Sequence, residues 1–211
     1  MHVTVETTRQ PGQQSGLRRC QIHTGHANLG ESKLVRAHLD VGKQCVIEWR
    51  AVDHHLPIVE TGVWPDEAAT RAFAEKLALQ SALRDAFITL HGDLGAGKTT
   101  LARHLLQALG VEGRIKSPTY AIVETYEAAG CAISHFDFYR FNDPQEWEDA
   151  GFRDIFASPG LKLVEWPQKA AGLLPVADLD IDLRADGETL RLVSLTALSP
   201  RGVHLLQGLA P

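Results

Sequence analysis

The spacing of hydrophobic residues changes along the chain, and each change marks an expected element. Residues 86–90 form a short apolar run rich in β-forming residues, which predicts a strand. After a glycine-rich segment, leucines recur at helical spacing over residues 101–109, and Gly110 follows as a helix terminator. Residues 66–83 open with acidic residues and continue with apolar residues at helical spacing, which predicts an amphipathic helix.

Further runs extend this pattern to the end of the chain. Strands are predicted at residues 121–126, 131–138, 161–165, 178–183 and 188–195, and helices at 144–150, 168–174 and 200–209. The turn signal Ala185-Asp186-Gly187 joins the last two strands into a β-hairpin. Trp147 is expected to point inward from an otherwise acidic helix. Mixed strands and helices predict an α/β fold.

The glycine-rich segment between the first strand and its helix carries the clearest chemistry. Residues 92–99 match the phosphate-binding pattern G-x-x-x-x-G-K-[ST]. Glycine lets the backbone adopt left-handed angles and direct several N–H groups at one anion, and the helix that follows adds its positive end. Lys98 is expected to reach the β- and γ-phosphates, and the Thr99 hydroxyl to hold Mg²⁺. Strand, glycine loop and helix in this order predict a nucleotide site.

Two acidic residues end apolar strands downstream of this loop. Asp137 and Glu165 would lie beside the loop if their strands join its sheet, because ligands of open α/β sheets sit at the carboxyl ends of strands. There Glu165 could order Mg²⁺ or the attacking water. Asp137 has a plain alternative as a solvent-facing residue of an edge strand, and Trp166 as a core side chain. The segment Ser117-Pro118-Thr119 is either an ordered functional loop or only a turn that precedes a strand.

Composition narrows the class of protein. Among 211 residues, 44% are hydrophobic and 22% charged, as in a globular protein with one good domain and an appendage. The net charge of −5 argues against a free-standing nucleic-acid binder, so no DNA partner is expected. No run is long enough to cross a membrane, and no signal peptide is visible. Three widely separated cysteines make a disulfide framework improbable, so a cytoplasmic protein is expected.

The first part of the chain differs from the rest. Residues 1–57 show no lasting helical or strand period and are interpreted as an N-terminal extension, either disordered or upstream of the true start. Because Met1 is the only methionine, a later start would need a codon other than ATG. A metal site built on Cys20, His23 and His26 is the alternative, but their spacing fits no common zinc pattern. Residues 58–211 are expected to form the nucleotide-binding domain.

The absence of two sequence motifs indicates which base the bound nucleotide carries. The chain has no Asn-Lys-x-Asp segment and no Asp-x-x-Gly after the loop, so guanine recognition has no visible basis. Adenine is therefore the expected base, and ATP with Mg²⁺ the expected ligand.

Four segments in order resemble the bacterial TsaE (YjeE) family: residues 92–100, 116–120, 135–140 and 163–167. The resemblance covers residues 61–183 and implies a P-loop NTPase-like mixed sheet flanked by helices, which the C-terminal hairpin suits. It also implies an ATPase that works with TsaD and TsaB in making N6-threonylcarbamoyladenosine in tRNA, with tRNA as an indirect partner.

The resemblance also assigns site residues. The phosphates would be held by Gly95, Ala96, Gly97, Lys98, Thr99 and Thr100, and Mg²⁺ by Thr99 and Glu165. Lys98, Asp137 and Glu165 would be catalytic. Thr119 resembles a switch-like threonine, Trp166 an aromatic residue beside the nucleotide, and Thr70 a contact near the adenine.

Two other functions remain compatible with the sequence. A phosphotransferase would use the same loop, but the short connectors after residue 126 leave little room for a lid and an acceptor pocket. A nucleotide-binding scaffold would bind ATP and partner proteins, and its function would not depend on ATP hydrolysis. Asp137 and Glu165 in one site favour turnover.

Overall fold

The computed structural model describes residues 5–7, 20–22, 57–128 and 130–209. The chain divides into two units, residues 1–54 and 55–211. In the first unit, β1 (Val5–Thr7) pairs antiparallel with β2 (Cys20–Ile22). The predictions of an N-terminal extension and of a metal site with His23 and His26 fall mainly outside the described residues. No described helix is long and apolar enough to span a bilayer.

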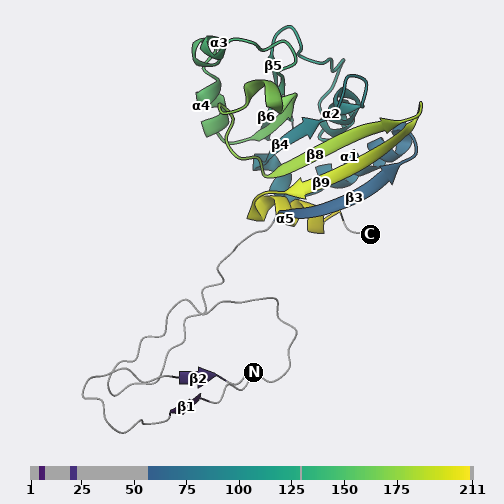
Figure 1. The fold of residues 1–211 in the computed structure, drawn as a ribbon. Coiled ribbons are helices and arrows are strands. Elements are labelled where there is room, and N and C mark those ends of the chain that lie inside the picture. The colour runs from purple at the N-terminus through teal and green to yellow at the C-terminus, as the bar shows by residue number, and fades with distance from the viewer. Residues whose placement is uncertain (1–4, 8–19, 23–56, 129, 210–211) are drawn as a thin grey trace. The chain divides into compact units, whose positions relative to one another are not determined.

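The second unit is built on a seven-stranded mixed sheet with the strand order β3-β9-β8-β4-β7-β6-β5 (Figure 1). Its strands are β3 (Ile58–Trp64), β4 (Phe87–His91), β5 (Val123–Ala128), β6 (Cys131–Asp137), β7 (Leu161–Glu165), β8 (Leu179–Asp186) and β9 (Leu190–Ala197). The four inner strands β8, β4, β7 and β6 run parallel. The outer pairs are antiparallel. The parallel strands therefore end at one edge, where a ligand site is expected.

Helices cover the sheet on both faces. They are α1 (Glu67–Ala78), α2 (Lys98–Ala108), α3 (Pro144–Asp149), α4 (Phe152–Ala157) and α5 (Pro200–Gln207), with short 3₁₀ helices η1 (Ser81–Asp85) and η2 (Pro167–Ala170). Figure 1 shows α1 behind β8 and β9, and α4 beside β6. This arrangement confirms the predicted fold class, a mixed sheet flanked by helices with a C-terminal hairpin.

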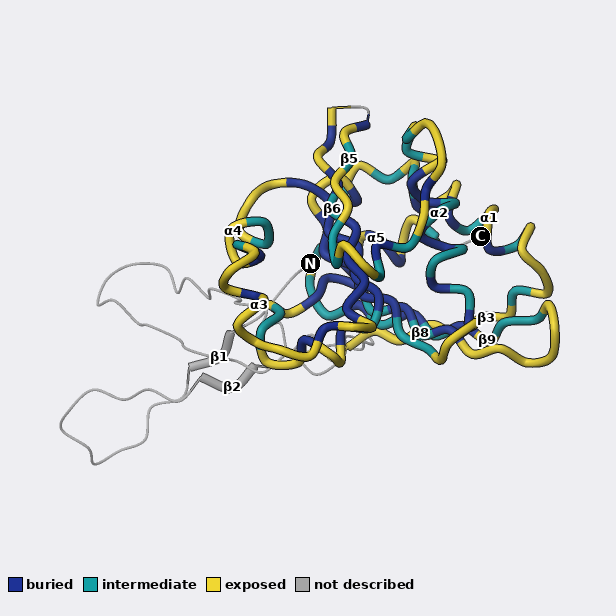
Figure 2. Tube along the Cα trace, turned by 90° about the horizontal axis from the view of Figure 1, so that it is seen from above, coloured by how far each residue is buried: buried dark blue, intermediate teal, exposed yellow. Residues whose placement is uncertain are grey.

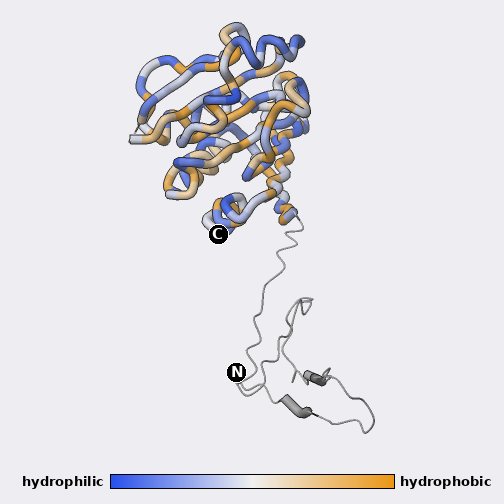
Figure 3. The backbone as a smooth tube through the Cα atoms, turned by 90° about the vertical axis from the view of Figure 1, so that its left-hand side faces the viewer, coloured by the Kyte–Doolittle hydropathy of each residue, from blue (hydrophilic) through white to orange (hydrophobic). Residues whose placement is uncertain are grey.

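The period of two along each strand creates two separate cores. Ile88 and Leu90 of β4 join a cluster with α1, α2 and α5, whereas Phe87 joins an aromatic cluster with α3 and α4. On β6, Ile133 faces the first cluster and Phe136 the second, because successive side chains point to opposite faces. Figure 2 shows the buried residues concentrated in the middle of this unit, and Figure 3 shows hydrophobic and hydrophilic residues alternating along it.

Most of the predicted elements are present at the predicted places. The hairpin of β8 and β9 turns at Gly187, whose φ of +78° suits glycine. The terminal helix is α5, and Trp147 of α3 points inward with 3% of its surface exposed.

The prediction of a helix over residues 66–83 was wrong about its C-terminal end. The α-helix stops at Ala78, and a 3₁₀ helix follows from Ser81. Leu83 is nevertheless fully buried, so it extends the hydrophobic pattern without extending the helix. The extended backbone of Gln80 separates the two elements, and its side chain donates to the Leu205 carbonyl at 3.0 Å.

Two predicted elements are displaced or shortened. The strand predicted at 121–126 begins at Val123, because the Ile122 amide closes a tight turn onto the Pro118 carbonyl at 2.6 Å. The helix predicted at 168–174 is only the 3₁₀ turn η2, which follows Trp166 in the left-handed region (φ +57°). Strand β3 and helix α4 were not predicted.

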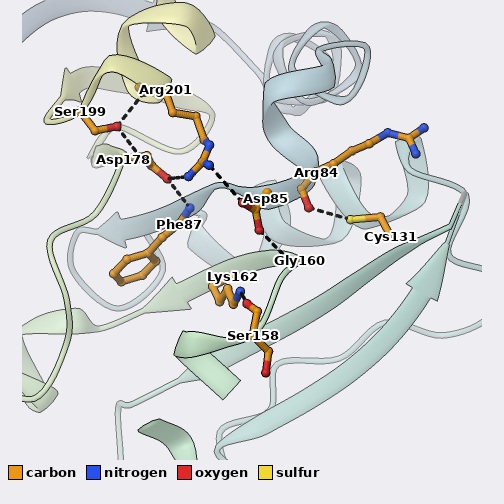
Figure 4. A network of polar contacts seen from close by, with 11 residues as sticks. Arg84, Asp85, Phe87, Cys131, Ser158, Gly160, Lys162, Asp178, Ser199 and Arg201 are labelled. Carbon is orange, nitrogen blue, oxygen red and sulfur yellow. Dashed lines mark hydrogen bonds and ion pairs between the residues drawn. The ribbon is translucent and has the colours of Figure 1, made fainter. Parts of the chain in front are cut away.

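A polar network ties α5 to the end of the sheet where β4 begins (Figure 4). The Asp178 carboxylate accepts from the Phe87 amide at 2.9 Å, from Arg201 at 3.2 Å and from the Ser199 hydroxyl. Arg201 also contacts Asp85 at 3.0 Å. The network fixes the end of the sheet opposite to the glycine loop.

This packing makes Gly202 of α5 sensitive to any side chain. A Cβ at Gly202 would lie 1.8 Å from the Asp178 carbonyl oxygen, and backbone atoms cannot move aside cheaply. We expect Gly202→Ala to lower the free energy of unfolding by about 1–3 kcal/mol, as overpacking typically does. Urea unfolding followed by circular dichroism measures it. Gly62→Ala is the matched control, because no atom lies within 4 Å of its added Cβ; equal losses in both variants would contradict the packing argument.

Candidate functional site

The glycine loop connects the buried strand β4 to α2 and needs glycine at defined places. Gly92, Gly95 and Gly97 have φ values of +129°, +80° and +108°. At Gly92 a Cβ would also lie 2.2 Å from the Leu183 carbonyl oxygen of the neighbouring strand β8. The loop therefore wraps tightly over the end of the sheet and delivers Lys98 as the first residue of α2. The free N–H groups of a helix's first turn favour an anion at this position.

Lys98 points back over the loop. Its Nζ donates to the carbonyl oxygens of Gly92 and Asp93 at 2.7 and 2.8 Å, and lies 4.0 Å from the centre of the Trp166 ring. Burial lowers the pKa of Lys98, while the carboxylates of Glu165 and Asp137 oppose that shift. An ammonium in this setting can neutralise phosphate oxygens at the mouth of the loop.

Glu165 ends β7 beside Lys98 and is almost fully buried, with 1% of its surface exposed. One carboxylate oxygen, Oε2, accepts from the Thr99 hydroxyl at 2.8 Å. The other, Oε1, lies 3.0 Å from Nε2 of His135 on β6. A carboxylate and a hydroxyl side by side are oxygen ligands of the kind that Mg²⁺ prefers.

Asp137 ends β6 directly opposite Glu165 in the parallel pairing of β6 and β7. Its Oδ2 accepts from the hydroxyls of Thr119, at 2.5 Å, and Ser117. Its Oδ1 accepts from the Tyr139 amide at 2.9 Å. Asp137 is 3% exposed, so the alternative of a solvent-facing acid is wrong. The segment at 117–119 is an ordered loop that Asp137 holds against the site.

One pocket gathers most of the predicted site residues. It is lined by Leu94, Gly95, Gly97, Lys98, Thr99, Thr100, Ser117, Thr119, Asp137, Tyr139, Glu165 and Trp166. The Trp166 ring is tilted against that of Tyr139, with ring centres 5.0 Å apart, and it stays partly exposed, so it is not simply core filling.

Two predicted residues lie apart from that pocket. Thr70 and Ala96 line an adjoining pocket with Trp64, Glu67, Gly97, Thr100, Leu183, Glu188, Thr189 and Arg191. The Thr70 hydroxyl points to the Asp66 carbonyl oxygen at 3.5 Å within its own helix. Gly97 and Thr100 line both pockets, so the two adjoin at the loop.

Three residues of the site were missed from the sequence. His135 precedes Asp137 by two positions, so strand alternation already places both on one face. Ser117 belongs to the same segment as Thr119. Arg191 donates from Nε to the Ala96 carbonyl at 2.8 Å, yet 95 positions separate the two residues and no sequence signal connects them.

Comparisons with known proteins agree with this geometry. The family model described as Threonylcarbamoyl adenosine biosynthesis protein TsaE matches residues 64–193, which include every residue of the two pockets. The chain belongs to the TsaE family. A TsaE relative from Haemophilus influenzae is 44% identical over 140 residues, covering 64% of this chain and 89% of that protein. A TsaE relative from Bacillus subtilis is 34% identical over 164 residues, covering 78% and 94%.

A solved structure supports the TsaE fold as well. The crystal structure of YdiB from Bacillus subtilis has a TM-score of 0.59 and 29% sequence identity, and the match covers 74% of this chain and 96% of that one. Membership of the TsaE family implies nucleotide binding, in agreement with the loop of residues 92–99. In the described part of the chain, no group of three or more His, Cys, Asp or Glu side chains could hold a metal.

Proposed function

We propose that the chain is a Mg²⁺-dependent ATPase that acts with the TsaD and TsaB proteins in making N6-threonylcarbamoyladenosine in tRNA. Membership of the TsaE family supports the role in threonylcarbamoyladenosine biosynthesis. The observation that carries the ATPase is the 2.8 Å hydrogen bond between the Thr99 hydroxyl and the Glu165 carboxylate, directly beside the glycine loop. Two oxygen ligands next to a phosphate cradle are what a Mg²⁺–nucleotide complex requires.

The loop and the start of α2 would hold the phosphates. Gly95 to Thr100 supply backbone N–H groups, and Lys98 supplies a cation that would exchange its carbonyl partners for phosphate oxygens. Thr99 and Glu165 would hold Mg²⁺. When bound, that ion would neutralise charge that develops on the phosphate oxygens.

The two acidic side chains, Glu165 and Asp137, would act on the attacking water, directly or through neighbouring hydroxyls. Glu165 Oε2, beside the Thr99 hydroxyl, would orient a water and accept its proton. Asp137 would act through Thr119 and Ser117, since it fixes the loop that carries both hydroxyls. Trp166 would close one side of the site over Lys98.

The adjoining pocket suits the adenine. It opens beside Gly97 and Thr100, so a nucleotide whose phosphates lie on the loop can extend its base toward Thr70 and Trp64. The Trp64 ring, which packs at a tilt against Phe73 with ring centres 4.7 Å apart, would supply an apolar wall. Thr70 would contact the base or ribose from α1.

A basic groove next to the site supports docking of partner proteins. Arg103, Arg114 and Lys116 line it together with Thr99 and Ser117, which also line the nucleotide pocket. Among the described residues, no ion pair involves these three cations. An acidic partner surface would be attracted to this groove and would touch the site directly.

The experiment measures ATP hydrolysis with Mg²⁺, alone and with purified TsaB and TsaD. We expect the partners to accelerate turnover, because a site completed by partners needs them for alignment. Reversing two groove charges, Arg103→Glu with Lys116→Glu, is expected to weaken that stimulation about tenfold or more and to reduce its dependence on salt.

Arg184→Glu is the control, because its side chain is 81% exposed and lies outside the groove. Stimulation that survives the groove reversal would show that partners dock elsewhere. Tight ATP binding with no turnover under any condition would favour a nucleotide-binding scaffold.

A further inference from the structure

His135 is the buried polar residue of the site that the proposed reaction does not use. Its side chain is fully buried on β6, and its Nε2 lies 3.0 Å from Glu165 Oε1 on the neighbouring strand β7. The parallel register puts His135 opposite Leu163, two residues before Glu165, so the two side chains share one face of the sheet.

The surroundings of the His135 ring indicate which of its nitrogens carries the proton that is donated to Glu165. Nε2 faces a carboxylate oxygen, which is an acceptor, so Nε2 carries a hydrogen. Nδ1 is buried and has no hydrogen-bond partner in the described part of the chain. The contact is therefore assigned as a hydrogen bond that Nε2–H of His135 donates to Oε1 of Glu165.

We infer that His135 is a positioning residue for Glu165. A carboxylate held at one oxygen can still turn about its terminal bond. Glu165 is held at both oxygens, by His135 at Oε1 and by the Thr99 hydroxyl at Oε2. The His135 bond selects Oε2 as the oxygen that faces the nucleotide pocket, and it preserves that choice when Thr99 takes another partner. This role rests on the proposed ATP hydrolysis, and such supporting hydrogen bonds fix functional groups in many sites.

Two substitutions separate positioning from packing. His135→Phe keeps the ring shape but removes the donor, and we expect it to lower kcat for partner-stimulated ATP hydrolysis about 10- to 100-fold with KM for ATP little changed. His135→Gln keeps an N–H donor at similar reach, and it should restore most of that loss. Thermal unfolding of both variants checks that they are folded at the assay temperature.

His204→Gln is the control, because His204 is an exposed histidine of α5 that lines neither pocket. It should leave kcat unchanged. Equal loss in His135→Phe and His135→Gln, or no loss in His135→Phe, would overturn the inference. The double variant His135→Phe with Glu165→Gln should be no slower than Glu165→Gln alone, because the two residues act as one unit.

A second measurement needs no turnover. Nitrogen-15 NMR of the histidine rings in the nucleotide-free protein should show His135 with a proton on Nε2, and its signals should shift in Glu165→Gln but not in Glu127→Gln. A ring without a proton on Nε2, or insensitivity to Glu165→Gln, would overturn the positioning role. If the wild-type chain shows no ATPase activity with its partners, the proposed function fails, while this spectrum still tests the contact.

Discussion

Glu165→Gln is expected to reduce ATP hydrolysis about 100-fold or more while ATP binding persists, because loss of a general base typically costs that much. Glutamine has the same shape, but its single carbonyl oxygen can accept from only one of the two partners, the Thr99 hydroxyl and His135 Nε2. It lacks the negative charge that would bind Mg²⁺ and the basic oxygen that would take a proton from water. Steady-state ATPase assays with TsaB and TsaD, beside binding of a fluorescent ATP analogue, measure the two effects separately.

Glu127→Gln is the control for that result. Glu127 lies on β5, is exposed and does not line either pocket, so its substitution should leave turnover at the wild-type level. If Glu165→Gln loses nucleotide binding together with turnover, its main role is in holding Mg²⁺ and ATP. If it loses neither, the chain is a nucleotide-binding scaffold and the proposed hydrolysis is wrong.

The centre of the site was predictable because local sequence and strand direction determine it. The loop at 92–99 is contiguous, and its glycines carry the positive φ angles that the motif requires. Asp137 and Glu165 are far apart in sequence, yet both end parallel strands, and parallel strands bring their carboxyl ends to one edge. The pattern of apolar runs was sufficient to find those ends.

Other features depend on contacts that the sequence pattern does not encode. Strand β3 is an edge strand with six exposed residues of seven, so it shows none of the alternation that a half-buried strand has. Arg191 reaches the loop only because the hairpin folds back beside it. The pairing of His135 with Glu165 requires the register of two strands, which turns and loops set and the hydrophobic pattern alone does not.

Phe136→Ala is expected to destabilise the domain by about 3–5 kcal/mol, the usual range for truncating a buried phenylalanine. Phe136 is fully buried and its ring lies 5.0 Å from that of Phe156 and 5.4 Å from that of Phe152. Alanine would leave a cavity between β6 and α4, and a small domain has only about 5–15 kcal/mol of stability in total. Urea unfolding gives the loss directly.

The same substitution tests whether the aromatic cluster supports the site on the other face of the sheet. Phe136 lies between Asp137, which lines the nucleotide pocket, and His135, which contacts Glu165, so a loosened β6 moves both. ATP binding should therefore weaken below the unfolding temperature. Tyr120→Ala, at a residue that is 85% exposed, should change the free energy of unfolding by less than about 0.5 kcal/mol. A Phe136→Ala variant as stable as Tyr120→Ala would show that α4 does not hold β6 in place.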